Sequence, residues 1–321
     1  MGDSYRDRTI TLASQVLVGS QVTKLLDKLN SRRGGIILVF HEISQTRLAK
    51  QLAQLSELYK FISLSEFVSR LARGKSTTGL AVITFDDGYG SVLESAAHLA
   101  QIHGWPMTFF LPTRYLDTRE PYWFQELEPL LERATCDHMT IDDMYLPLRD
   151  QVSRAKTLEI LNRRFMSFPS TEKIDELLRR VRYVISGSEE RPADLQTSEP
   201  ISWERIRELV RREELSFEVH SVNHLALSCL TEEAIRGEML ESRARVEQMT
   251  GCNAEHFCYP YGGLDEIGSL APRIARSLFR SATTMLRGRC HKGTDSAMLP
   301  RVPLYEQDSE HRVALKVSLA R

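Results

Sequence analysis

The stretch Leu80–Tyr89, with the sequence LAVITFDDGY, decides the fold of this chain. It begins with an unbroken run of apolar and β-branched residues, which is typical of a strand that is buried on both faces. Two carboxylates follow the run directly, and the pair Asp87–Gly88 favours a turn there. Similar apolar runs occur at Ile36–Phe40, Met107–Leu111 and Leu215–Val219, so we expect a sheet of buried strands.

Segments with helical periodicity separate these strands. This alternation predicts an α/β domain that is built on parallel strands. Further short strands are predicted near His256–Tyr259, Ser281–Thr284 and Met298–Val302. The predicted helices are Leu48–Tyr59, Ser65–Arg73, Val92–Ile102, Ser202–Glu214, Thr231–Met249 and Pro272–Leu278.

Two segments do not fit the alternation. Residues 121–200 are rich in charge and helical in pattern, without a convincing buried strand, and we interpret them as a helical insertion. Apolar residues recur at helical spacing from Leu12 to Leu29, which predicts an amphipathic N-terminal helix. Its polar face is short and not strongly basic, so packing on the main domain is favoured over a role at a membrane surface.

The composition excludes several classes of protein. The 321 residues include 42 basic and 43 acidic side chains, so nucleic acid is not expected as a partner. No apolar run reaches the roughly 18 residues of a membrane-spanning helix, and the N-terminus lacks the pattern of a secretory signal. We therefore expect a cytoplasmic protein with no transmembrane segment; peripheral membrane contact stays open.

The five cysteines are odd in number and widely spaced, so we expect free thiols. Cys252 and Cys258 flank His256, an arrangement that could bind a metal. Zinc motifs usually bring cysteines closer together and in pairs, so this interpretation is the less favoured one.

Three polar clusters follow predicted strands, and in parallel α/β folds the carboxyl ends of the strands face the functional site. The first cluster is the pair Asp86 and Asp87. Adjacent carboxylates repel each other unless a cation or a shared proton relieves the repulsion. The alternative is a simple turn, since Asp-Gly pairs are common in turns.

The second cluster is His220 and His224, in the sequence HSVNH. Histidines at positions i and i+4 lie on one face of a helical turn and can converge on one ion. With the Asp86–Asp87 pair they supply two nitrogens and one carboxylate oxygen, a catalytic zinc set that leaves positions for water and substrate. The alternative is that both are ordinary surface or core residues.

The third cluster is Phe257–Gly263, with the sequence FCYPYGG. Its proline and paired glycines fix a loop in which backbone N–H groups can point at a ligand, as an oxyanion site requires. The alternative is a loop that ends a strand and carries packed tyrosines.

The order of these clusters resembles the polysaccharide deacetylase family, also called the NodB-homology family or carbohydrate esterase family 4. The sequence TFDDGY at Thr84–Tyr89 is similar to the first family motif, and His220–His224 fits the second, H-[ST]-x-x-H. The sequence YPYG at Tyr259–Gly262 is similar to the third motif. The resemblance covers about Ile36–Pro303.

The resemblance implies one catalytic domain with an α/β fold, a distorted (β/α) barrel with fewer than eight strands. Residues 34–120 and 201–305 would form the barrel core. Residues 121–200 would form the helical insertion, and residues 1–33 a helical N-terminal extension.

The resemblance also implies roles for single residues. Asp87, His220 and His224 would hold a divalent metal, with Zn²⁺ the expected ion, and Asp86 would be the general base. The backbone N–H of Tyr261 would face the oxyanion. In relatives with a permuted motif order a histidine after the first strand is the general acid, and His41 in the sequence FHEI matches it. A strand-end histidine that only forms hydrogen bonds is the alternative.

Two departures from the family pattern affect the site. The arginine that orients the catalytic aspartate near the third motif is missing, and Arg301 could approach from another strand. We place Tyr259, Pro260 and Arg301 in the substrate-binding group. The Leu-x-His motif that supplies the acid in other members is also absent near the C-terminus, which makes His41 more important.

Tyr122 and Trp123, at the start of the insertion, are candidates for stacking on a sugar, with core packing the favoured role.

The function implied by the resemblance is metal-dependent removal of an N-acetyl or O-acetyl group from a saccharide or saccharide precursor. Two alternatives stay open. One is a hydrolase of another amide, such as a formamido sugar. The other is a catalytically silent saccharide-binding protein with the same fold, which the missing arginine motivates.

Overall fold

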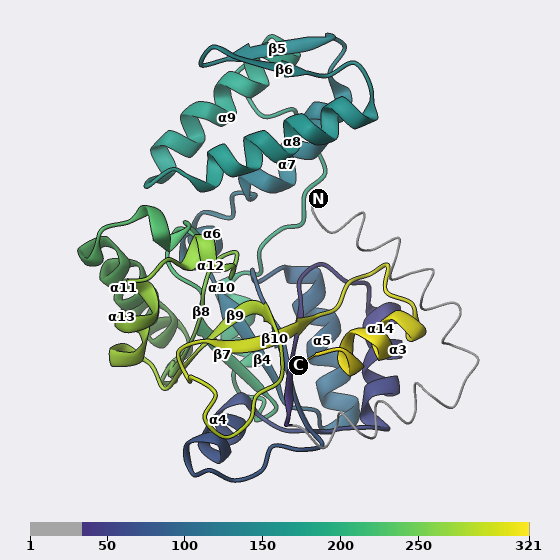
Figure 1. The fold of residues 1–321 in the computed structure, drawn as a ribbon, viewed down its shortest axis with the longest axis vertical. Coiled ribbons are helices and arrows are strands. Elements are labelled where there is room, and N and C mark those ends of the chain that lie inside the picture. Colours follow the sequence, from purple (N-terminus) through teal and green to yellow (C-terminus); the bar gives the residue numbers. More distant parts are fainter. Residues whose placement is uncertain (1–33, 321) are drawn as a thin grey trace.

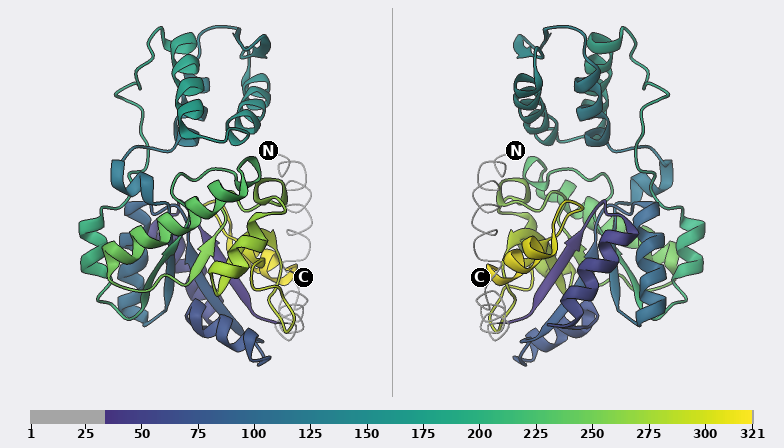
Figure 2. Two further views of the ribbon diagram at one scale, coloured as in Figure 1. Left: turned by 90° about the vertical axis from the view of Figure 1, so that its left-hand side faces the viewer. Right: turned by 90° about the vertical axis from the view of Figure 1, so that its right-hand side faces the viewer.

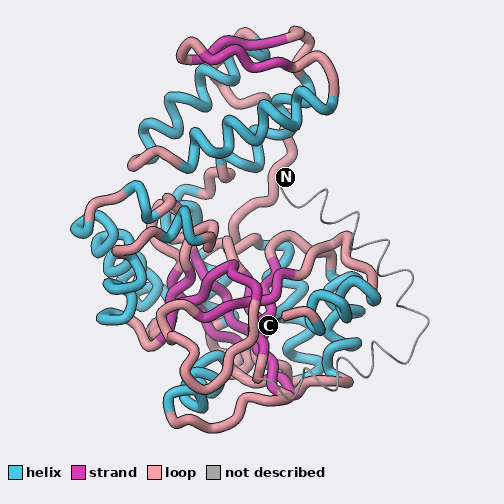
Figure 3. The backbone as a smooth tube through the Cα atoms, viewed as in Figure 1, coloured by secondary structure: helices cyan, strands magenta, loops and turns pink. Residues whose placement is uncertain are grey.

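The computed structural model describes residues 34–320 (Figure 1). The predicted helix Leu12–Leu29 lies outside the described residues. Strands gather in one part of the molecule with helices around them, and a smaller unit carries its own helices and a hairpin (Figure 3). Figure 2 shows that this smaller unit lies beyond one end of the strands and is joined to the rest by two connecting segments.

Seven parallel strands close into a barrel. Their order is β1-β10-β9-β8-β7-β4-β3, and pairing of β3 with β1 completes the ring. A short extra strand, β2 (Lys60–Phe61), pairs with the beginning of β3. The predicted distorted (β/α) barrel is therefore confirmed. Its strands are β1 (Ile36–Phe40), β3 (Leu80–Phe85), β4 (Met107–Leu111), β7 (Leu215–Val219), β8 (His256–Cys258), β9 (Ser281–Arg287) and β10 (Leu299–Pro303).

A row of phenylalanines aligns four neighbouring strands. Phe40, Phe85, Phe109 and Phe217 lie opposite one another in the strand pairing, and successive ring centroids are 5.4, 4.9 and 5.6 Å apart. The rings belong to the apolar core that the strands share with the surrounding helices, and each stacked pair contributes about 0.5–1.5 kcal/mol beyond burial. Since side chains alternate between the two faces of a strand, Asp86, which follows Phe85, points into the barrel.

Helices cover the barrel and mostly begin and end near the predicted positions. The predicted start of the second helix is confirmed, since Ser63 Oγ accepts a hydrogen bond from the Glu66 N–H at 3.2 Å. None of the helices in residues 34–320 is long and apolar enough to cross a membrane. The barrel helices are α3 (Gln45–Ser56), α4 (Leu64–Ala72), α5 (Gly90–His103), α6 (Thr113–Thr118), α10 (Trp203–Leu209), η2 (Leu227–Cys229), α11 (Glu232–Thr250), α12 (Leu264–Ile267) and α13 (Ala271–Leu278).

Residues 121–200 contain a separate apolar core, formed mainly by α7 (Trp123–Arg133), α8 (Gln151–Met166) and α9 (Thr171–Ser186). They also contain an antiparallel hairpin of β5 (His138–Ile141) and β6 (Met144–Pro147), which the sequence analysis did not predict. Its strands are short and only half buried, so they lack the continuous apolar run that marks the barrel strands. The turn between them uses positive φ angles of 48° at Asp142 and 61° at Asp143.

The C-terminal helix α14 (Glu310–Ser318) was also not predicted. It begins at Ser309, whose Oγ accepts from the Arg312 N–H at 3.4 Å, and it packs on α3. The buried guanidinium of Arg289 donates to the carbonyl oxygens of Val317, Ala320 and Gly34 at 2.8, 3.1 and 3.2 Å. This arginine therefore joins the last helix to the beginning of the barrel.

Candidate active site

A cavity of about 290 Å³ lies where the strands end and the insertion approaches. The barrel contributes polar side chains to it, including His41 after β1, Asp86 and Asp87 after β3, and His220 and His224 after β7. All five are residues that the sequence analysis selected, and the structure brings them together.

Asp87, His220 and His224 are buried and converge on one point. Asp87 Oδ1 lies 3.4 Å from His220 Nε2 and 3.3 Å from His224 Nε2. Within residues 34–320, Asp87 Oδ1 has no hydrogen-bond partner although it is buried. Ligand atoms bound to one tetrahedral zinc at about 2.0–2.1 Å would lie roughly 3.3–3.4 Å apart. These three side chains therefore fit a divalent cation.

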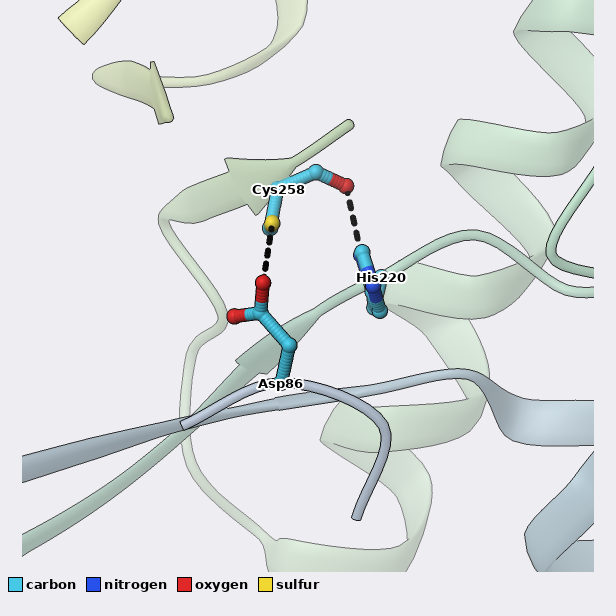
Figure 4. A group of neighbouring side chains, drawn as sticks. All are labelled: Asp86, His220 and Cys258. Atoms are coloured by element: carbon cyan, nitrogen blue, oxygen red, sulfur yellow. Dashed lines mark hydrogen bonds between the residues drawn. The ribbon is translucent and has the colours of Figure 1, made fainter. Parts of the chain in front are cut away.

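The ring of His220 is held in the orientation that a metal ligand needs. Its Nδ1 lies 2.8 Å from the carbonyl oxygen of Cys258 (Figure 4). Because a carbonyl only accepts, Nδ1 carries the proton and Nε2 is left with a free lone pair that faces Asp87. This backbone contact from β8 fixes the tautomer of a residue that follows β7.

The second motif does not form the helical turn that the sequence analysis considered. Ser221 and His224 have positive φ angles of 65° and 53°, so the segment is a loop. Glu238 of α11 holds this loop, since its Oε2 accepts from the N–H groups of Val222 and Asn223 at 2.9 and 2.8 Å. The two imidazoles therefore converge through loop geometry. Nothing in the sequence around Glu238 indicates this role, because it lies in an ordinary charged helix.

Asp87 is also held in place by the insertion. Its φ angle of 68° is unusual for a residue other than glycine. The buried Tyr122 hydroxyl donates to the carbonyl oxygen of Asp87 at 2.7 Å, and the Tyr122 ring lies edge-on to that of His224 with centroids 5.6 Å apart. Tyr122 therefore packs in the core, as favoured from the sequence, and it also supports two of the converging residues.

Burial alone would raise the pKa of Asp87, but the adjacent imidazoles of His220 and His224 outweigh this effect. The pKa of Asp87 is therefore lowered well below its usual value. The carboxylate remains ionised through the neutral range, as a metal ligand must be.

Asp86 forms a bidentate ion pair with Arg301. Arg301 Nη1 donates to Asp86 Oδ1 at 2.8 Å and Nη2 donates to Oδ2 at 2.7 Å, and both side chains are buried. Burial would raise the pKa of Asp86, but the charge and hydrogen bonds of Arg301 reverse this effect and lower it. Arg301 thus occupies the place of the aspartate-orienting arginine that the third motif lacks.

The assignment of Arg301 and Pro260 to substrate binding does not fit the structure. Arg301 is fully buried behind Asp86, and neither residue lines the cavity. Tyr259 does line it, and its hydroxyl donates to the carbonyl oxygen of Ala297 at 2.8 Å.

His41 and Tyr261 both line the cavity. His41 Nε2 is 3.6 Å from Asp86 Oδ2, and its side chain is 30% exposed. Tyr261 has a φ angle of 60°, and the part of the chain that the structure describes offers no hydrogen-bond acceptor to its N–H. Trp123 lines the cavity and donates from Nε1 to the Tyr261 hydroxyl at 3.3 Å.

Cys258 is a neighbour of the catalytic candidates that sequence reasoning did not place in the site. Its Sγ lies 3.4 Å from Asp86 Oδ2 (Figure 4) and 3.2 Å from Arg301 Nη2. Asp86, His220 and Cys258 lie close enough to suggest a second metal cluster, but the adjacent guanidinium opposes a cation there. The other metal site that the sequence suggested contains His256 between Cys252 and Cys258. Both ring nitrogens of His256 form hydrogen bonds, to Ser65 at 2.9 Å and to Ser281 at 2.8 Å.

Arg301→Met is expected to destabilise the protein by about 3–5 kcal/mol, because it leaves the buried Asp86 without its partner. The pKa of Asp86 should also rise, since burial then acts without the opposing charge and hydrogen bonds of Arg301. Urea unfolding measures the first effect, and an acid limb of the rate profile that moves to higher pH reports the second. The exposed Arg211 provides the control, with Arg211→Met expected within about 0.5 kcal/mol of wild type. Unchanged stability in Arg301→Met would contradict the pairing.

The comparisons with known proteins agree with this geometry. A family model described as polysaccharide deacetylase matches residues 73–271. No curated protein matches the sequence. The Streptococcus pyogenes deacetylase PplD in complex with acetate is similar in structure, with a TM-score of 0.57 and 14% identity over 88% of this chain and 97% of that one. IcaB from Ammonifex degensii has a TM-score of 0.56 and 17% identity, with 89% and 97% covered.

At these identities the solved structures show the fold alone. The family model covers more than half of the chain, and its range includes the first two motifs and the Tyr261 loop. Because the match is of this extent and the residues of the motifs meet in one buried cluster, the chain belongs to the polysaccharide deacetylase family.

Proposed function

We propose that the protein is a metal-dependent hydrolase that removes an N-acetyl group from a saccharide or a saccharide precursor, with Zn²⁺ as the expected ion. One observation carries the proposal. The Asp86 carboxylate is oriented by Arg301 and lies 3.6 Å from His41 Nε2 and close to His220 of the Asp87–His220–His224 cluster. All of these residues except Arg301 line one cavity. This arrangement combines ligands, a base and an acid within reach of one acyl group.

A divalent cation, when bound, supplies Lewis-acid chemistry: it lowers the pKa of a coordinated water and polarises a carbonyl oxygen. Asp86 accepts the proton of the water that attacks the acyl carbon. Its lowered pKa keeps it ionised and ready to accept at neutral pH. Arg301 prevents the carboxylate from rotating, because both of its oxygens are held by the guanidinium.

The attack places negative charge on the acyl oxygen. The unpaired N–H of Tyr261 can donate to that oxygen, and backbone donors aimed at developing charge are an effective form of catalysis. Collapse of the intermediate then breaks the carbon–nitrogen bond. The departing nitrogen is a poor leaving group unless it is protonated, and His41 at the cavity edge supplies the proton.

The proposal is tested by measuring acetate release from a panel of substrates by the purified, metal-loaded protein. The panel contains N-acetylated and O-acetylated sugars, N-formyl sugars and simple aryl acetates. We expect release from N-acetylated sugars. Preferential release of formate would favour another amide hydrolase, and sugar binding without release of any acyl group would favour a silent binding protein. The cytoplasmic location remains a prediction.

His41→Ala is expected to slow N-acetyl hydrolysis by about 10²–10³-fold while changing aryl acetate hydrolysis by less than about 10-fold. The difference arises because an amine needs protonation to leave, whereas a phenolate does not. Steady-state kinetics on the two substrates measures it. His98→Ala, on an exposed face of α5, is the control and should leave both rates unchanged. Equal losses on both substrates would remove His41 from the role of general acid.

A further inference from the structure

The insertion forms a roof over the cavity. Trp123 and Phe124 of α7, together with Asn162 and Met166 of α8, line the side that faces the aspartates and histidines. We call these four residues the roof. They come from the smaller unit beyond the strand ends in Figure 2. The cavity therefore has a polar floor from the barrel and a largely apolar cover from the insertion.

Hydrogen bonds connect the insertion helices that carry the roof to the barrel. Besides the contacts of Tyr122 and Trp123 with the barrel, Gln125 Nε2 donates to Glu42 Oε1 at 3.2 Å, beside His41. At the other end, Cys229 Sγ donates to the Met166 carbonyl oxygen at 3.4 Å. Both α7 and α8 are thus joined to barrel loops beside the cavity.

Asn162 is the polar member of the roof. It lies one turn before Met166, so the two side chains share a face of α8. Within the described residues the Asn162 amide has no hydrogen-bond partner, although the residue is partly buried. The amide lines the cavity, so it can donate to and accept from a ligand that enters there. Pockets that recognise small molecules typically combine an apolar wall with a few such polar groups.

The size of the cavity limits the ligand. Its volume of about 290 Å³ lies just below the roughly 300–1,000 Å³ that is usual for small-molecule sites. One sugar ring fits this description, with an apolar ring face against Trp123 and hydroxyl groups within reach of an amide. Several linked rings would need more room between roof and floor.

We propose that the roof recognises a single acylated sugar ring and that Asn162 hydrogen-bonds the hydroxyl groups of that ring. This inference rests on the proposed function and adds the substrate class. The enzyme then acts on a free or carrier-linked monosaccharide unit, or on the end of a chain, and internal units of a polymer are poor substrates.

Asn162→Leu tests the contact while keeping the size of the side chain. We expect the KM for an N-acetylated monosaccharide to rise by about 10–100-fold, with kcat changed by less than about 3-fold, because the lost hydrogen bonds bind the sugar and not the reacting atoms. The kcat/KM for an aryl acetate, which has no sugar hydroxyls, should stay within about 2-fold. Arg163→Leu is the control, since this neighbour on α8 is 76% exposed and should leave both substrates unaffected.

A second arm compares the N-acetylglucosamine monosaccharide with its β-1,4-linked tetramer, with the deacetylated positions mapped by mass spectrometry. We expect deacetylation of the monosaccharide and of a terminal unit of the tetramer. Deacetylation of internal units at the terminal rate, or an unchanged KM in Asn162→Leu, would overturn the inference and leave the proposed function intact. A wild type that hydrolyses the aryl acetate but neither releases acetate from these sugars nor binds them in calorimetry would overturn both.

Discussion

Asp86→Asn is expected to reduce turnover of an N-acetylated sugar by about 10³-fold and to leave the metal content unchanged. The amide cannot accept the proton of the attacking water, and general base catalysis is typically worth about 10²–10⁴-fold. The metal should remain because Asp86 lies outside the cluster of Asp87 and the two histidines. Steady-state kinetics and elemental analysis of the same preparation measure both outcomes. Wild-type turnover in Asp86→Asn would exclude Asp86 as the base.

This variant should also lose stability, because it leaves the fully buried Arg301 without a counter-charge. Removal of one partner of a buried pair costs about 3–5 kcal/mol. The double variant Asp86→Asn/Arg301→Met separates folding from chemistry. It removes both charges, so it should recover part of the stability while staying inactive. If the double variant regained activity together with stability, the loss in Asp86→Asn would be a folding effect.

The sign of the pH dependence follows from the lowered pKa of Asp86. Its folded pKa lies below the unfolded value of about 3.9. The ion pair therefore contributes stability that is fully present above that unfolded value, and this contribution is lost as the pH falls through the lower folded pKa. The wild type should lose stability more steeply than the double variant in this acid range.

His224→Ala is expected to lower the affinity for a divalent cation by more than about 100-fold and to reduce deacetylation to background. Loss of a supporting contact to a metal ligand typically costs 10–100-fold, so loss of the ligand itself should cost at least as much. Calorimetric titration of the chelator-treated protein with Zn²⁺ measures the affinity. The control is His138→Ala, at an exposed position of the hairpin. Wild-type affinity in His224→Ala would show that this imidazole is not a ligand.

The strands of the barrel could be predicted closely from the sequence. The predicted bounds Ile36–Phe40, Met107–Leu111 and Leu215–Val219 agree with β1, β4 and β7. Each is a continuous apolar run between polar turns, which is the pattern of a strand covered on both faces. The hairpin in the insertion lacks such a run, and helix α14 lies at the chain end. Neither element was predicted.

The residues that form the site could be predicted more easily than the contacts between them. Asp86, Asp87 and the histidines follow strands and belong to motifs, so their meeting could be expected. The pairing of Arg301 with Asp86 depends on which face of β10 the arginine occupies. The register of β10 with β9 shifts between Leu299 and Arg301, and such an irregularity breaks the simple alternation of faces. The position of Cys258 beside Asp86 likewise depends on how the strands close into the barrel.

The phenylalanine row on the outside of the barrel has a consequence for how variants of this protein fail. A slip of one residue between β3 and its neighbours would turn Phe85 inward and move Asp86 to the helix side. A mispaired chain would thus lose its aromatic contacts and its base in the same step. The strand register that buries these four outward rings is therefore also the register that places Asp86 in the site, although none of the rings takes part in the chemistry.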